Sequence, residues 1–217
     1  MPGIQSADAG CMAASKLAKL ATSTPSMVIW AGTVAIGMAG LVHYQMTSGA
    51  SGREAPHSWP AGVDDIVRKP GRLTLVMALH PQCPCSRASL HELSQLMARS
   101  GEKMDAHILF VKSEGAPADW CDGNLWKQAK DIPGVSVSID NDAKDGSIFG
   151  ATTSGQVIVY DASGTIRFSG GITDGRGHEG DNTGLSAILE LIRDGKTAVS
   201  TTPVYGCSLG VSRLKKQ

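Results

Sequence analysis

The sequence is poor in charge and in aromatic side chains, and it has no excess of either sign. Charged residues make up 18% of the 217 positions and aromatic residues 5%, and 20 Lys and Arg are balanced by 20 Asp and Glu. This balance argues against nucleic acid as a partner, because phosphate binding requires a basic excess or a clustered basic face. Five cysteines are too few for a disulfide-rich scaffold of this length, and an apolar content of 41% is too high for a disordered chain. The composition therefore predicts a folded protein.

The shortage of charge is concentrated near the N-terminus, since residues 20–52 contain no Lys, Arg, Asp or Glu. Within this stretch, residues 27–46 are apolar and rich in Gly and Ala, over the roughly 20 positions that a helix needs to cross a bilayer. Trp30 and Tyr44 lie near the two ends, where interfacial aromatic residues are common. We therefore expect a single transmembrane helix at 27–46.

The flanking charges predict how this helix is oriented. Lys16 and Lys19 precede it, and the first charge after it is Arg53. By the positive-inside rule, residues 1–26 form a cytoplasmic tail. The protein is then a single-pass protein of the inner (cytoplasmic) membrane, with its C-terminal domain periplasmic or otherwise extracytoplasmic. Two alternatives stay open: a cleaved signal peptide that exits at Ser48-Gly49-Ala50, and a buried helix of a soluble core.

The remainder of the chain is divided by composition into three parts. Residues 47–64 are rich in Ser, Gly, Ala and Pro and are typical of a linker. Residues 65–209 carry the patterns of a folded domain, and 210–217 form a basic C-terminal tail. Apolar periodicity and turn signals in the domain predict strands at 72–80, 107–112, 135–139, 156–160 and 165–169 and helices at 86–99, 124–130 and 185–193. Helices between the early strands and a late hairpin indicate an α/β fold with a mixed sheet.

The order of these elements around the cysteines resembles the thioredoxin fold. A strand runs into a cysteine-containing turn that opens a helix, and a hairpin follows later in the chain. In detail the sequence is similar to the membrane-anchored TlpA-type and RedB-like branch of the thioredoxin-like superfamily. The matching pieces are HPQCPCSRASL at 80–90, IPGV at 132–135, FGATTSGQVIVYD at 149–161, FSGGIT at 168–173, GRGHEGDN at 175–182 and TPVYGCSL at 202–209.

Two features depart from the thioredoxin pattern. A thioredoxin has two residues between its cysteines, whereas here Pro84 alone separates Cys83 from Cys85. Thioredoxins also place a cis-proline before the hairpin, facing the dithiol, and the equivalent position here is Gly155, after Ser154. The resemblance therefore implies the fold more strongly than it implies how a substrate docks.

The Cys83-Pro84-Cys85 motif predicts dithiol–disulfide exchange with protein clients. At a strand-to-helix junction, the unpaired N–H groups of the first helical turn stabilise a thiolate, and Arg87 either adds positive charge or is solvated. A disulfide across one intervening residue is a strained and labile ring, which suits exchange chemistry. By position, Cys83 attacks and Cys85 resolves. His80 either exchanges protons with the dithiol or is a structural residue of the strand.

A third cysteine, Cys207, is also a candidate catalytic residue. It follows a turn near the C-terminus, where it either resolves a mixed disulfide or pairs with Cys121. Residues 175–180 fit the pattern G-x-G-x-x-G but lack the second parallel strand of a dinucleotide site. We expect instead a polar loop on the same edge of the domain as the dithiol.

Two other functions compete with the oxidoreductase, which itself needs no cofactor. The first is copper handling, because Cys83 and Cys85 supply two soft ligands for Cu(I), and either His178 or Cys207 is available as a third; the preferred set is Cys83, Cys85 and His178. Related copper chaperones of the thioredoxin fold use such a cysteine pair with a distant histidine. The second is a binding domain without enzymatic activity that has kept the fold.

Overall fold

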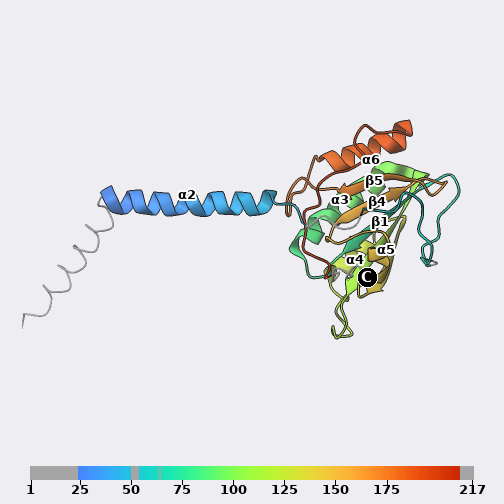
Figure 1. Cartoon of the computed structure of the whole chain (residues 1–217), viewed down its shortest axis with the longest axis horizontal. Helices are drawn as coiled ribbons and strands as arrows, with labels where there is room; N and C mark the ends of the chain where they lie inside the picture. The colour runs from blue at the N-terminus through green and yellow to red at the C-terminus, as the bar shows by residue number, and fades with distance from the viewer. Residues whose placement is uncertain (1–23, 50–53, 64, 211–217) are drawn as a thin grey trace, which may run out of the picture. The chain divides into compact units, whose positions relative to one another are not determined.

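The computed structural model describes residues 24–49, 54–63 and 65–210, and the chain divides into two units between Tyr44 and Gln45 (Figure 1). The expected cytoplasmic tail and basic C-terminal tail lie almost entirely outside the described residues.

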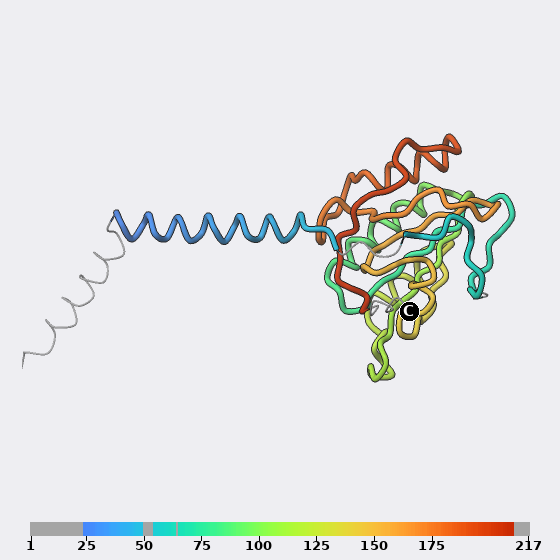
Figure 2. Tube along the Cα trace, in the orientation of Figure 1, coloured from blue at the N-terminus to red at the C-terminus, as the bar shows by residue number. Residues whose placement is uncertain are grey.

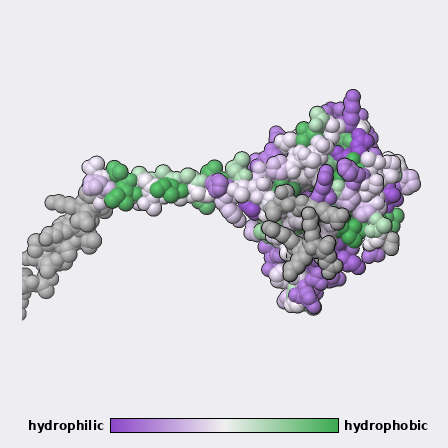
Figure 3. Space-filling model, in the orientation of Figure 1, coloured by the Kyte–Doolittle hydropathy of each residue, from purple (hydrophilic) through white to green (hydrophobic). Residues whose placement is uncertain are grey.

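The N-terminal unit contains most of α2, Thr24–Met46, which covers the predicted membrane span. This helix has 23 residues and a mean hydropathy of 1.6 over its most apolar window. Apolar side chains are distributed along it (Figure 3), and none of its residues is buried. By length and composition α2 is able to cross a membrane.

The second unit is built on one five-stranded sheet in the order β3-β2-β1-β4-β5. β1 pairs in parallel with β2, and β2 pairs in parallel with β3, whereas β4 lies antiparallel to both β1 and β5. The predicted hairpin is thus confirmed as β4 and β5. The strands are Leu73–Leu79 (β1), Met104–Lys112 (β2), Val135–Asn141 (β3), Gln156–Tyr160 (β4) and Ile166–Gly171 (β5).

The strands β1, β2 and β4 are buried on both faces of the sheet, whereas the edge strand β3 is largely exposed or half-buried. Because side chains alternate along a strand, Leu75 and Met77 of β1 join one core cluster and Val76 joins the other. The first cluster includes residues of α3, Pro84–Ser100, and of α6, Thr183–Asp194, and these two helices pack together. The shorter helices are η1 (Gly101–Lys103), α4 (Asn124–Lys130) and α5 (Lys144–Ile148).

The domain has the thioredoxin-like fold that the sequence predicts. The helix α3 follows the central strand β1 directly, and the β4–β5 hairpin precedes the closing helix α6 (Figure 1). The helix α5 was not expected, because its five residues carry no apolar periodicity and Gly146 is the only one buried. After α6 the chain turns back across the domain as an extended segment, drawn red in Figure 2.

Candidate functional site

The site is centred on Cys83, which stands at the N-terminus of α3. Cys83 is the N-cap residue with an extended backbone (φ −81°, ψ 123°), and Pro84 follows as the first helical residue. Proline suits this position because the first N–H of a helix has no partner within the helix. The Cys83 N–H donates to the carbonyl of His80 at 3.1 Å, and the Ser86 N–H donates to the carbonyl of Cys83 at 3.0 Å. The cysteine is therefore fixed at the positive end of the α3 dipole, with only 2% of its surface exposed.

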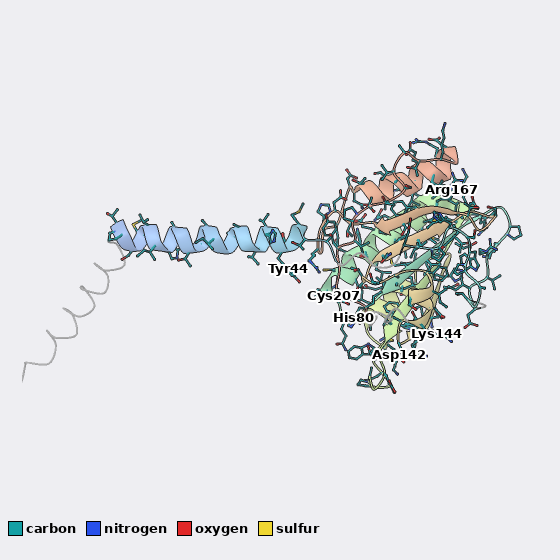
Figure 4. All side chains as sticks on the ribbon, viewed as in Figure 1. Tyr44, His80, Asp142, Lys144, Arg167 and Cys207 are labelled. Atoms are coloured by element: carbon teal, nitrogen blue, oxygen red, sulfur yellow. The ribbon has the colours of Figure 1, made fainter. Side chains whose placement is uncertain are left out.

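The sulfur atom in contact with Cys83 belongs to Cys207, which is labelled in Figure 4. The two Sγ atoms lie 2.7 Å apart although 124 positions separate them in the sequence. An approach of less than 1 Å would bring them to the bond length of a disulfide, about 2.05 Å. Of the two roles considered for Cys207, the structure therefore favours a role at the dithiol over pairing with Cys121.

The three thiols of the site differ in acidity. Burial raises the pKa of Cys83, but hydrogen bonds from Cys207 and from the backbone at the start of α3 outweigh it, and the pKa lies below its ordinary value. Burial, with the hydrogen bond and the charge of Cys83, raises the pKa of Cys207 to about 12. Burial and the charge of Cys83 also raise the pKa of Cys85. Cys83 is therefore the thiol that ionises first.

Arg176 brings a positive charge into contact with the site. Arg87 is exposed on α3, whereas the guanidinium of Arg176 interacts with the sulfur of Cys85 and opposes the rise of its pKa. The same guanidinium donates from Nη1 to the carbonyl of Gly206 at 2.7 Å. Arg176 thus links Cys85, at the start of α3, to Gly206, the residue before Cys207.

A buried carboxylate holds the loop that carries Arg176. Glu92 on α3 accepts the Gly180 N–H at 2.7 Å and the side-chain amide of Asn182 at 3.2 Å. Asn182 in turn caps α6, because its Oδ1 accepts the Leu185 N–H at 2.7 Å. The glycine-rich loop therefore lies on the same edge as the dithiol, as expected, and it positions Arg176 beside Cys85.

A second loop, residues 152–155, faces the cysteine turn from the start of β4. The Ser154 hydroxyl accepts the N–H of His80 at 2.9 Å and lies 2.8 Å from the Ser86 hydroxyl. Gly155 has a φ of +89°, and its N–H donates to the carbonyl of Ala78 at 2.8 Å. Among the described residues there is no cis peptide bond. This loop occupies the place that the sequence analysis assigns to the cis-proline loop. Its backbone has a positive φ at Gly155, a conformation that glycine adopts readily because it has no side chain.

Two further residues that the sequence analysis considers, His80 and Cys121, lie in packed surroundings. The Nδ1 atom of His80 accepts the Gln82 N–H at 3.2 Å, its ring packs edge-on against Trp120 with the centroids 5.8 Å apart, and burial lowers its pKa. Cys121 is buried in the α3-side core, and burial raises its pKa. Neither arrangement resembles that of Cys83.

The copper ligand set is not assembled. His178 is exposed in its loop, and Cys83, Cys85 and His178 do not converge. Within the described ranges, no three His, Cys, Asp or Glu side chains are grouped as a metal ion would require. The copper site formed by these three residues therefore stays an alternative prediction, and this arrangement of the described residues does not assemble it.

Sequence reasoning missed Arg176, Glu92, Ser154 and Gly206. One of them left a readable signal, because Glu92 lies among Leu90, Leu93 and Leu96 on the buried face of α3. A carboxylate at such a position is almost always paired. The other three act through contacts between segments far apart in the chain, which no local pattern reports.

Comparisons with known proteins support the fold. A scan against protein-family models finds no match, and a search of curated proteins finds none. Among solved structures, the chain is similar to a hypothetical protein from Sinorhizobium meliloti 1021, at 19% identity and a TM-score of 0.56, over 78% of this chain and 98% of that one. It is also similar to an uncharacterized conserved protein from Geobacillus kaustophilus, at 17% identity and a TM-score of 0.55, over 76% and 93% of the two chains.

A third similar structure is a secreted disulfide oxidoreductase from Mycobacterium tuberculosis, homologous to E. coli DsbE. The identity is 14% and the TM-score 0.40, over 57% of this chain and 82% of that one. The Sinorhizobium meliloti and Geobacillus kaustophilus structures define a shared fold, and the activity has to be argued from the site.

Proposed function

We propose that the protein is a membrane-anchored thiol–disulfide oxidoreductase whose nucleophile is Cys83 of the Cys83-Pro84-Cys85 motif. The observation that carries the proposal is a thiol of lowered pKa at the start of α3, with two further thiols, Cys85 and Cys207, in interaction with it. A cysteine that only fills core space needs neither property, as Cys121 illustrates.

The exchange begins when the Cys83 thiolate attacks one sulfur of a client disulfide. A bond forms between Cys83 and that sulfur, the client S–S bond breaks, and the second client sulfur leaves as a thiolate that takes up a proton. Another thiol of the protein then loses its proton and attacks the Cys83 sulfur, which releases the first client sulfur. The client gains two electrons and the protein loses two. The steps are reversible, and the potentials of client and electron partner set their direction.

The anchor is the second part of the proposal. We infer that α2 crosses the inner membrane once and places the domain on the extracytoplasmic side, as in the TlpA-type and RedB-like proteins that the sequence resembles. A fusion of alkaline phosphatase after residue 60 should be active, and a reporter that works only in the cytoplasm should be inactive at the same position. The reverse pattern would contradict the orientation.

Reduction of insulin by the full chain in detergent, with dithiothreitol as electron source, tests the chemistry. We expect Cys83→Ser to reduce the rate to that of dithiothreitol alone, while the matched control Cys121→Ala keeps the wild-type rate. If Cys83→Ser and wild type are equally fast, or are equally inactive with insulin, with a disulfide of the peptide 202–209 and with a dithiol peptide, the domain binds without exchange and the proposal is wrong.

A further inference from the structure

Residues 200–209, which we call the C-terminal segment, contact β5 at one end and Cys83 near the other. At the start of the segment, the carbonyl of Ser200 accepts the N–H of Ser169 at 2.9 Å. The Thr202 hydroxyl then donates to the carbonyl of Gly171 at 2.7 Å. The absence of a side chain at Gly171 lets the main chain of the segment approach the strand closely. These contacts direct the segment across the end of the sheet toward the cysteine turn.

At its far end the segment pairs with the loop 152–155 as an antiparallel strand. The Ser154 N–H donates to the carbonyl of Cys207 at 2.8 Å, and the Leu209 N–H donates to the carbonyl of Thr152 at 2.9 Å. Between these bonds, Thr153 and Ser208 form an antiparallel bridge. An extended peptide that adds itself to an exposed main-chain edge is held in the same way. The loop therefore presents a peptide-binding edge next to Cys83, and the chain fills that edge itself.

Gly206 makes this approach possible. A β-carbon at position 206 would collide with the carbonyl of Ser154, a main-chain group that cannot turn away as a side chain can. The Arg176 guanidinium holds the Gly206 carbonyl from the other side. A strand bound on this loop therefore needs glycine immediately before the cysteine that meets Cys83.

We propose that the C-terminal segment is a tethered client: it occupies the surface on which an extended Gly-Cys peptide binds, and Cys207 is the thiol that resolves the mixed disulfide on Cys83. This inference rests on the proposed thiol–disulfide exchange. The substrates that it predicts are proteins with a disulfide in which one cysteine directly follows a glycine in an extended segment.

The reaction then proceeds by replacement of one strand by another. A client strand displaces the segment, and the Cys83 thiolate attacks its disulfide, so that a Cys83–client bond forms and the distal client sulfur leaves with a proton. When the segment returns, the deprotonated Cys207 attacks Cys83 and expels the client thiolate. The products are a reduced client and a Cys83–Cys207 disulfide, and Cys85 stays reduced in this step. A dithiol reductant returns Cys83 and Cys207 to thiols.

Disulfide mapping tests the pairing. The reduced full chain in detergent is oxidised with glutathione disulfide, the remaining thiols are alkylated, and the linked peptides are identified by mass spectrometry. We expect a Cys83–Cys207 bond in wild type and in Cys85→Ala. A Cys83–Cys85 bond in wild type, with Cys207 alkylated, would overturn the inference.

Gly206→Ala tests whether docking of the segment creates the pairing, because this variant keeps every cysteine. Displacement of the sulfur by about 1 Å should slow formation of the Cys83–Cys207 bond by about 10²-fold. The matched control is Gly123→Ala, where a β-carbon meets open space and the backbone has a φ of −82°. Equal rates in Gly206→Ala and in the control would show that the docked strand does not direct the pairing.

The substrate class is tested with two peptides in the Cys207→Ala variant. One has the sequence of residues 202–209 with its cysteine as a glutathione mixed disulfide, and the other has valine in place of the glycine. Both compete with the same tethered segment, so the segment does not affect the ratio of their rates. We expect Cys83 to react with the glycine peptide about tenfold faster or more. Equal rates would contradict the assigned substrate class.

The two proposals fail in different ways. If Cys83→Ser slows neither the reduction of insulin nor that of the glutathione mixed disulfide of the peptide 202–209, the exchange function is wrong. If Cys83 is essential but links to Cys85, the exchange function stands and the tethered client is wrong.

Discussion

The β1–α3 unit and the C-terminal segment each bring a cysteine to the same point, but different interactions hold them. Six of the seven residues of β1 are buried, whereas Gly206 and Leu209 are the buried residues of the segment. The first unit depends on apolar side chains packed on both faces of the sheet. The segment depends on main-chain hydrogen bonds and on glycines that permit close approach.

This difference predicts which of the two cysteines moves. Burial of one large aliphatic side chain contributes about 1.5–3 kcal/mol, while a hydrogen bond contributes a net of about 0.5–1.5 kcal/mol. The β1–α3 unit buries many such side chains, so Cys83 is fixed whenever the domain is folded. The segment near Cys207 is held by few hydrogen bonds, and such a region opens locally without global unfolding. Cys207 is therefore the mobile partner.

The largest expected effect is on the β1–α3 unit. Leu93 is fully buried on α3, and Leu93→Ala should lower the free energy of unfolding by about 2–5 kcal/mol, because lost burial and the resulting cavity add together. Urea unfolding of the full chain in detergent, followed by tryptophan fluorescence, measures this change. A loss below about 1 kcal/mol would mean that apolar packing does not dominate this unit.

The next effect concerns the polar connection between α3 and the loop of Arg176. Glu92→Ala removes the acceptor of Gly180 and Asn182, and it should cost about 1–3 kcal/mol in unfolding free energy and speed alkylation of Cys85. The matched control is Glu179→Ala in the same loop, where the side chain is exposed and the change should stay within about 0.5 kcal/mol. Equal effects of the two variants would contradict a positioning role for Glu92.

Gly206→Ala should have a smaller effect on global stability, but it should strongly weaken the docking of the C-terminal segment. The free energy of unfolding should change by less than about 1.5 kcal/mol, the scale of a single hydrogen bond. Hydrogen exchange at the amides of Ser154 and Leu209 should nevertheless become faster, while the amides of β1 keep their protection. Unchanged exchange at both amides would show that the segment is not released.

The smallest expected effect is a shift in the pH at which Cys83 loses its reactivity toward an alkylating reagent. Because hydrogen bonds stabilise the Cys83 thiolate, its alkylation by iodoacetamide should persist to lower pH than that of an ordinary thiol, and it should be lost as the pH falls through the lowered pKa. Cys207→Ala removes one of these hydrogen bonds and should move the profile of Cys83 to higher pH. A profile that does not move would mean that Cys207 does not tune the pKa of Cys83.

The same contrast explains what the sequence could predict. The strand β1, the helix α3 and the β4–β5 hairpin follow from apolar periodicity and turn residues, which are local properties. The position of Cys83 at a helix start follows from the same patterns with Pro84.

The arrangement around Cys83 required three-dimensional information. Arg176 reaches Cys85 because a distant carboxylate, Glu92, fixes its loop, and Cys207 reaches Cys83 because main-chain atoms pair across the fold. Main-chain pairing leaves little mark on side-chain patterns. The need for glycine at position 206 comes from the carbonyl of Ser154, which is distant in the sequence.

The most direct test is to trap the mixed disulfide between the full chain in detergent and a client protein with a Gly-Cys disulfide. The account predicts that the complex accumulates in Cys207→Ala, where no thiol returns to attack Cys83, and that it is resolved in wild type and in Cys85→Ala. Accumulation in Cys85→Ala, with rapid resolution in Cys207→Ala, would contradict it.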